Sequence, residues 1–139
     1  MRLTMYSEYS LRVLIYLAAI HDERATITGI ADAYGISRHH LTKIVHNLAR
    51  QGYVRTTRGK GGGVQLARRP DSIGLGEVIR ATEPDLDIVD CDGTRCPIRK
   101  ICLLRSALGA ARKTFLATLD RYTLANLVTN RAELVSLLS

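Results

Sequence analysis

The chain has 139 residues and a formal net charge of +7, with 46% hydrophobic and 24% charged residues. This composition is ordinary for a folded soluble protein of one domain, or of one compact unit with an extension. The apolar run at 11–20 is too short to span a membrane and lacks the order of a secretory signal, which excludes those two classes.

The first predicted element is an amphipathic core helix that contains the run 11–20, with Arg12 inside it and Glu8 just before it. The chain has three cysteines, an odd number that would leave one thiol unpaired. Free thiols persist in the cytosol, where disulfides are rare. We therefore expect a cytoplasmic protein.

The charges are unevenly distributed along the chain. Between Asp32 and Asp71 there are eight basic residues and no acidic one, whereas the stretch 83–92 carries five acidic residues and no basic one. A basic block of this kind favours a polyanionic partner, although a solvated basic surface would look the same by charge alone.

The segment 26–54 has the pattern of a helix-turn-helix. Thr26 or Thr28 can cap a first helix, and Gly35 suits the left-handed residue that ends it. Ser37 can cap the second helix, and Gly52 ends that helix. A chance helical hairpin would show the same pattern. As a DNA reader, the second helix would place its first turns in the major groove; the candidate contacts there are Ser37, Arg38, His39, His40 and Lys43.

A β-hairpin is predicted next, with two alternating strands on either side of RGKGGG. Arg58 and Lys60 would lie at its tip, where they can reach DNA phosphates or the minor groove. The glycine spacing matches neither a Walker loop nor a dinucleotide-binding loop, so we interpret the hairpin as the wing of a winged helix.

The rest of the chain predicts a short helix in IGLGEVIRATEP, an acidic loop and then a long helix. We expect a mostly α fold with a small β-hairpin wing. Its predicted parts are a winged helix-turn-helix domain at 1–82, a cysteine-containing loop at 83–102, a dimerisation helix at 103–128 and a tail at 129–139. The helix could fold back on its own domain, but a reader of two-fold operators is usually a dimer.

The three cysteines all lie in CDGTRCPIRKIC, as Cys91, Cys96 and Cys102. Thiolates are soft ligands for zinc, Cu(I) and iron–sulfur clusters. The wide spacing and the missing fourth soft ligand favour an iron–sulfur centre over structural zinc. Three unrelated thiols would be the ordinary alternative, but the rest of the chain has none.

The fourth ligand is left open by the sequence. Asp90 and Asp92 flank the first cysteine, while Glu8 and His21 are more distant candidates. An oxygen ligand on iron is more exchangeable than a thiolate, which suits a site that a small molecule must reach.

Taken together, YGISRHHLTKIVHNLARQGYV, RGKGGG, the C-x4-C-x5-C loop and LDRYTLANLV resemble the Rrf-type winged-helix regulators over nearly the whole chain. The likeness is greatest to the branch of nitric-oxide-sensing repressors. The cluster-status-sensing IscR-type branch carries a histidine where this chain has Ala107, which argues against that alternative.

The resemblance implies a homodimer that binds an operator in double-stranded DNA. It also implies a [4Fe-4S] cluster on Cys91, Cys96 and Cys102, with Glu8 of the partner subunit at the position of the family's Asp. A [2Fe-2S] cluster is the alternative, and Arg12 in place of a histidine ligand weakens it. The function predicted is a repressor controlled by nitric oxide. A zinc module and an electron-transfer iron–sulfur protein are the alternatives from other classes, and we expect no enzymatic activity.

Overall fold

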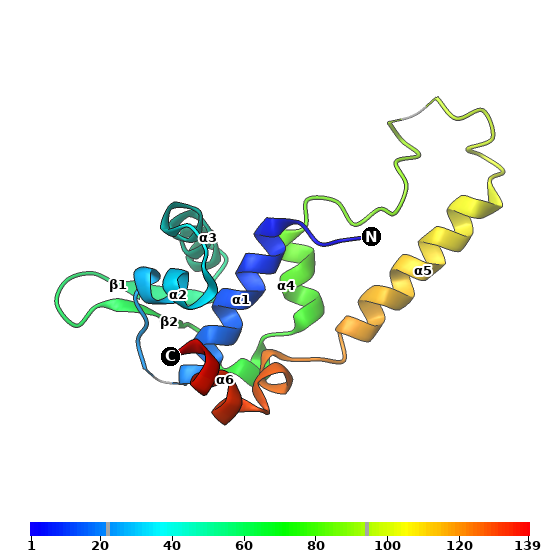
Figure 1. Ribbon diagram of the computed structural model, residues 1–139. Coiled ribbons are helices and arrows are strands. Elements are labelled where there is room, and N and C mark those ends of the chain that lie inside the picture. The colour runs from blue at the N-terminus through cyan, green and yellow to red at the C-terminus, as the bar shows by residue number, and fades with distance from the viewer. Residues whose placement is uncertain (22, 94) are drawn as a thin grey trace.

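The computed structural model describes residues 1–21, 23–93 and 95–139. Figure 1 shows a body of packed helices with a β-hairpin at one side and a long helix standing apart at the other. In chain order the elements are α1 (Met5–Ile20), α2 (Ile27–Tyr34), α3 (Arg38–Arg50), β1 (Val54–Thr57), β2 (Gly63–Leu66), η1 (Pro70–Ser72), α4 (Leu75–Thr82), α5 (Leu103–Leu119), η2 (Leu124–Val128) and α6 (Arg131–Leu138). The fold is therefore mostly α with a two-stranded wing, as predicted.

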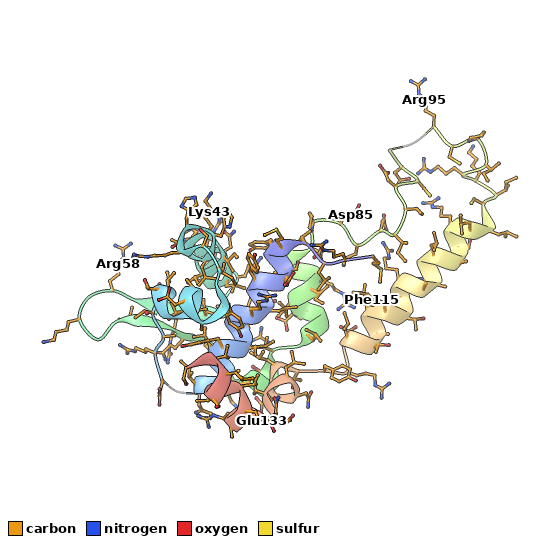
Figure 2. All side chains as sticks on the ribbon, in the orientation of Figure 1. Lys43, Arg58, Asp85, Arg95, Phe115 and Glu133 are labelled. Carbon is orange, nitrogen blue, oxygen red and sulfur yellow. The ribbon has the colours of Figure 1, made fainter. Side chains whose placement is uncertain are left out.

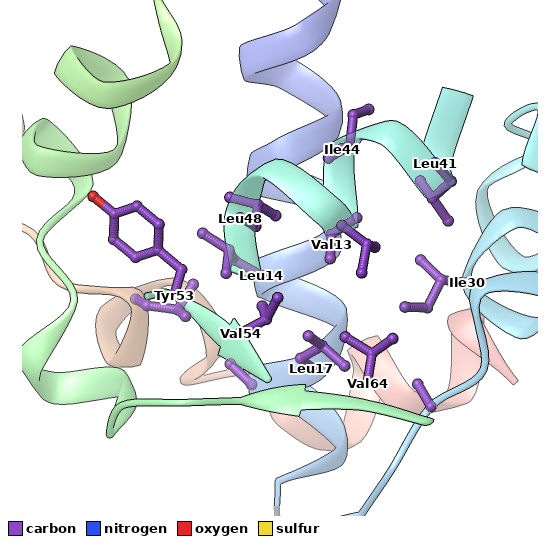
Figure 3. Packing of buried hydrophobic residues seen from close by; sticks show 14 of the residues in the cluster. Val13, Leu14, Leu17, Ile30, Leu41, Ile44, Leu48, Tyr53, Val54 and Val64 are labelled. Atoms are coloured by element: carbon purple, nitrogen blue, oxygen red, sulfur yellow. The ribbon is translucent and has the colours of Figure 1, made fainter. Parts of the chain in front are cut away.

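The first helix is the centre of the core. Val13, Leu14 and Leu17 of α1 are fully buried, and they belong to one cluster with the apolar residues of α2, α3 and the wing (Figure 3). Leu41 and Leu48 supply the buried face of α3 in that cluster. Because α1 lies beneath α3, a displacement of α1 would change the position of α3. No helix in the described part of the chain is long and apolar enough to cross a membrane.

The helix-turn-helix forms as the sequence predicts, with one exception. The hydroxyl of Thr26 accepts a hydrogen bond from the amide of Gly29 at 2.9 Å, which caps α2. Gly35 ends α2 in the left-handed conformation, with φ of 63°. Ser37 stands at the N-cap of α3, but its side chain makes no capping hydrogen bond. The predicted N-cap position of Ser37 is therefore confirmed, but the capping hydrogen bond is missing and the exposed hydroxyl is left for other contacts.

The wing is an antiparallel hairpin in which Val54 pairs with Leu66. Ala25, in the segment before α2, exchanges backbone hydrogen bonds of 2.9 and 2.7 Å with Val64. Arg24 then donates to the carbonyl oxygen of Gly61 at 2.6 Å, close to the wing tip. These contacts, which the sequence did not predict, fix the direction of the wing relative to the helix-turn-helix.

The long helix is shorter than predicted, because α5 ends at Leu119 rather than at 128. Asp120 follows as its C-cap, and the Oδ1 of Asn126 then accepts hydrogen bonds from the amide and hydroxyl of Thr123. These side-chain bonds start the separate turn η2 in place of a continued helix. The region 129–139, predicted as a tail, contains α6, whose Arg131 donates to the carbonyl oxygen of Ala19 at 2.6 Å.

The helix α5 has little packing of its own. None of its seventeen residues, all of which the structure describes, is buried. Leu103 and Leu104 are 83% and 62% exposed. An isolated helix with an uncovered apolar stripe is marginal in water, so α5 needs a further surface to pack against.

Candidate nucleic-acid interface and metal centre

The exposed face of α3 carries every residue that the sequence predicted for the major groove. Arg38, His39, His40 and Lys43 are all exposed, as is the preceding Ser37. The opposite face is held in the core by the apolar stripe of α3. The helix is therefore fixed on one side and presents donors on the other, which is what groove reading requires.

Two further side chains lie on this face that the sequence analysis did not single out. Thr42 and His46 are exposed on α3, on either side of the turn that carries Lys43. Thr42 donates its hydroxyl to the carbonyl oxygen of Arg38 at 2.9 Å. Helical spacing from Lys43 was the signal that could have identified His46.

The wing tip presents its cations to solvent. Arg58 and Lys60 are both exposed. Figure 2 shows Lys43 of α3 and Arg58 of the wing projecting to the same side of the view. Gly59 and Gly61 have φ of 88° and 75°, which side chains rarely adopt, so the tight tip depends on glycine.

The cysteine loop lies far from the body, at the outer end of α5 (Figure 1). Cys91, Cys96 and Cys102 are each partly exposed, and none is in a disulfide. Cys102 is the N-cap of α5. Within the described residues, no three His, Cys, Asp or Glu side chains lie close enough together to hold a metal ion. The ligand set therefore stays a prediction.

The two aspartates beside the first cysteine already have partners in the loop. The Oδ1 of Asp90 accepts from the amide of Gly93 at 2.6 Å. Asp92 forms an ion pair with Arg99, and Arg105 lies 4.0 Å from the same oxygen. Either aspartate would have to give up these contacts in order to bind a metal.

Glu8 projects from the first turns of α1 and is held by Arg12, one turn further along the helix. The two side chains are 41% and 39% exposed. The guanidinium of Arg12 also lies over the rings of Tyr9 and Tyr34, at 5.6 and 5.7 Å from their centres. Arg12 is thus fixed by α1 and α2 and holds the carboxylate of Glu8 at the surface.

The other distant candidate, His21, does not lie near Glu8. It is the C-cap of α1, at the opposite end of that helix, and it has φ of 61°. It lines a cleft beneath the wing. His21 and Glu8 therefore cannot act together in one metal site of a single subunit.

A carboxylate that sequence analysis left unassigned joins the cysteine-loop segment to α1. The Oε1 of Glu83 accepts hydrogen bonds from the amide and the hydroxyl of Thr4, at 2.7 and 3.1 Å, across 79 positions of sequence. Burial raises the pKa of Glu83, but hydrogen bonds from Ser7 and Thr4 outweigh it and hold the pKa below its usual value. Thr4 is the N-cap of α1, so the charge of Glu83 also lies at the positive end of that helix.

Both ends of α4 are also connected to the region that follows α5, the last turn through Arg80 and the first through Leu75. Arg80 makes a two-pronged ion pair with Asp120, the C-cap of α5, with N–O distances of 2.5 and 2.8 Å. The amide of Leu75 donates to the carbonyl oxygen of Tyr122 at 2.9 Å. The helix α4 therefore bridges α1 and the end of α5.

The fold is shared with solved structures. The structure of CymR, the global cysteine regulator of Bacillus subtilis, matches with a TM-score of 0.72 and 27% identity, over 94% of this chain and 98% of that one. The structure of T. potens IscR matches with a TM-score of 0.77 and 24% identity, over 94% of this chain and 88% of that one. The second likeness concerns the fold alone.

Relatives of known name match over almost the full length. The transcriptional regulator NsrR of Geobacillus kaustophilus is 49% identical over 99% of this chain and 97% of its own length. That of Bacillus subtilis is 46% identical with the same coverage. The model of the Rrf2 family, described as iron-dependent transcriptional regulators, matches residues 3–130. Its members regulate transcription and are not enzymes. The chain belongs to the Rrf2 family.

Proposed function

We propose that this protein is a repressor whose affinity for its operator is set by an iron–sulfur cluster and falls on exposure to nitric oxide. As an Rrf2 member it is a DNA-binding transcriptional regulator. The observation that carries the rest is the match of 49% identity with an NsrR over 99% of the chain, in a chain with three cysteines in twelve residues.

The residues present fit the chemistry of such a cluster. Cys91, Cys96 and Cys102 are free thiols with partial access to solvent, so they are available to bind iron. When bound, the cluster would supply iron sites that react with nitric oxide. Three thiolates leave one position for a ligand from elsewhere, and we propose Glu8 of the partner subunit for it.

Glu8 is suited to that role by its surroundings. Within its own subunit the carboxylate is 41% exposed and its described ion-pair partner is Arg12. Like the two aspartates, Glu8 would have to give up its present partner in order to bind a metal, and an exposed ion pair costs little to break. Arg12, which is held by two tyrosine rings, would keep the carboxylate oriented at the surface.

The path from Glu8 to the DNA-reading surface runs through α1. A change in how Glu8 is held would act on the first turns of that helix. Its buried residues Val13, Leu14 and Leu17 pack in one cluster with those of α3. A hundredfold change in operator affinity requires about 2.7 kcal/mol of coupling, which lies within the ordinary range for allosteric proteins.

We propose that the protein acts as a homodimer through α5. Leu103 and Leu104 are strongly exposed, and no part of the described chain buries the stripe on that helix. A second copy would cover the stripe and bring the cysteine loop of one subunit to the other. A two-fold dimer also matches a two-fold operator.

Operator binding by three forms tests the proposal: protein purified without oxygen, the same protein after iron removal, and the same protein after treatment with nitric oxide. We expect tight binding only by the first. Equal affinity in all three would contradict the proposal. A visible spectrum with iron and sulfide counts identifies the cluster, and a colourless sample with bound zinc would favour the zinc module.

Replacing Glu8 tests the fourth ligand separately. Glu8→Ala should change the spectrum or the lifetime of the bound cluster, whereas Glu133→Ala on α6 should not. Light scattering at the same protein concentration shows whether both variants remain dimers. An unchanged spectrum in Glu8→Ala would shift the assignment to Asp90 or Asp92.

A further inference from the structure

A cleft of about 600 Å³ lies beneath the wing, away from the cysteine loop. Its walls come from the end of α1, both wing strands, the segment 67–71, η2 and the start of α6. Figure 2 shows Lys43 on the upper side of the helical body and Glu133 of α6 on its lower side. The volume lies within the range of small-molecule sites.

The lining combines apolar surface with uncompensated positive charge. Ala18, Leu66 and Val128 contribute apolar walls. Two lining arginines are already neutralised, because Arg69 pairs with Asp71 at 2.7 Å and Arg68 pairs with Glu77 at 2.6 Å. The other two, Arg55 and Arg131, have no acidic partner among the described residues.

Arg131 is held in place by a contact that leaves its binding end available. Its Nε donates to the carbonyl oxygen of Ala19 at 2.6 Å, so the guanidinium is fixed against the end of α1. No bond from its two terminal nitrogens to another described residue is found. A fixed guanidinium with both terminal nitrogens available is the geometry that binds a carboxylate or phosphate in two-pronged fashion.

The backbone at the edge of the cleft is strained. His21 has φ of 61° and ψ of −125°, and it is the one non-glycine residue with positive φ in the described chain. Strain of this kind persists only where surrounding structure enforces it, and it gathers at ligand sites. The strained residue adjoins the same end of α1 that anchors Arg131.

We propose that this cleft is a binding site for a small organic anion, with a carboxylate or phosphate on Arg55 and Arg131 and an apolar body against Leu66 and Val128. A DNA phosphate fits the lining less well, because it has no apolar surface to bury in a concave site. Because Arg55 and Leu66 belong to the wing strands, a ligand would hold the wing against α1 and α6. The site is independent of the proposed cluster.

The test uses the full-length protein without its cluster and two organic anions, at constant ionic strength. The fluorescent probe 1-anilinonaphthalene-8-sulfonate reports binding, and octanoate displaces it. We expect saturable binding that weakens about tenfold in Arg131→Gln and in Arg55→Gln, the loss expected for one charge-assisted contact. Arg121→Gln, on an exposed arginine outside the cleft, should change it less than about twofold.

Two variants keep the test decisive if one misfolds. Arg131→Gln removes the anchor to Ala19, so its fold is checked by circular dichroism, whereas Arg55 is exposed on a strand and its replacement leaves the core intact. Equal weakening in Arg121→Gln, or no change in Arg55→Gln, would overturn the proposal. Displacement of the probe by inorganic phosphate at the concentration that suffices for octanoate would overturn it as well, because the apolar body would then contribute nothing.

Discussion

Replacing Glu83 by Gln tests the connection between the cysteine-loop segment and α1. The change keeps the size of the side chain and an acceptor oxygen but removes the charge that Thr4 binds through its amide and hydroxyl. Charge-assisted hydrogen bonds contribute roughly 1 kcal/mol more than neutral ones, and a negative charge at a helix N-terminus contributes up to about 1 kcal/mol. Because Glu83 is partly exposed, we expect the free energy of unfolding to fall by about 1 kcal/mol at pH 7.

The pH dependence gives this prediction its sharper form. The folded-state pKa of Glu83 lies below its usual value, so the carboxylate stabilises the fold above the unfolded pKa, and the contribution is lost as pH falls through the folded pKa. The free energies of unfolding of wild type and Glu83→Gln should therefore differ by a constant amount above about pH 5 and approach each other as pH falls through the folded pKa. Urea unfolding of the cluster-free protein at a series of pH values measures both curves.

The matched control is Glu133→Gln. Glu133 lies in the first turn of α6 and so, like Glu83 beside Thr4, is near the positive end of a helix, but no described side-chain hydrogen bond or ion pair holds it. The replacement of Glu133 should lower the free energy of unfolding by only about a few tenths of a kcal/mol. The reasoning is refuted if the two variants lose the same stability, or if the gap between wild type and Glu83→Gln persists unchanged at pH 3.5.

Three further predictions concern other contacts. Tyr53→Phe should lower the free energy of unfolding by about 1 kcal/mol at pH 7. Burial and Glu77 raise the pKa of Tyr53 to about 12, so wild type should lose this contribution between about pH 10 and 12 and the variant should not; urea unfolding in that range decides. Ser10→Ala should leave thermal stability unchanged or raise it by about 1 kcal/mol, because the buried hydroxyl of Ser10 has no hydrogen-bond partner among the described residues; a lower melting temperature would contradict this. Lys43→Ala should reduce the slope of the logarithm of the operator-binding constant against the logarithm of salt concentration by about one, and Lys113→Ala on α5 should not. If wild type and Lys43→Ala have equal slopes, Lys43 does not contact a DNA phosphate.

The DNA-binding part of the fold was predictable because its signals are local. Thr26 and Gly35 define the ends of α2 through contacts within a few residues, and four glycines define the wing tip. The apolar spacing of α3 predicted which face is exposed, and that prediction is confirmed by burial. The missing capping bond at Ser37 has a local cause as well, because residue type predicts the N-cap position but not the rotamer that completes the bond.

The remainder depends on contacts between residues far apart in sequence. The residue that follows α5, Asp120, pairs with Arg80, forty positions earlier. The connection of Glu83 to Thr4 and the packing of α6 on α1 are likewise long-range. In the cysteine loop, spacing identified the thiols as ligand candidates, but convergence on a cluster depends on the metal and on a second subunit.

The contacts of α4 explain how one short helix can relate the dimerisation helix to the DNA-reading helix. One end of α4 bonds to Thr4 at the start of α1, and its other residues bond to Asp120 and Tyr122 after α5. In the first turns of α1, Ser7 is buried and its side chain is hydrogen-bonded to Glu83. A small number of hydrogen bonds therefore holds the N-terminal turn of α1, and hydrogen bonds are easier to exchange than close apolar packing.

If α4 transmits the signal, Glu83→Gln should reduce the difference in operator affinity between cluster-bound and cluster-free protein, while cluster content stays the same. An unchanged difference would place the whole coupling on Glu8 and its own helix.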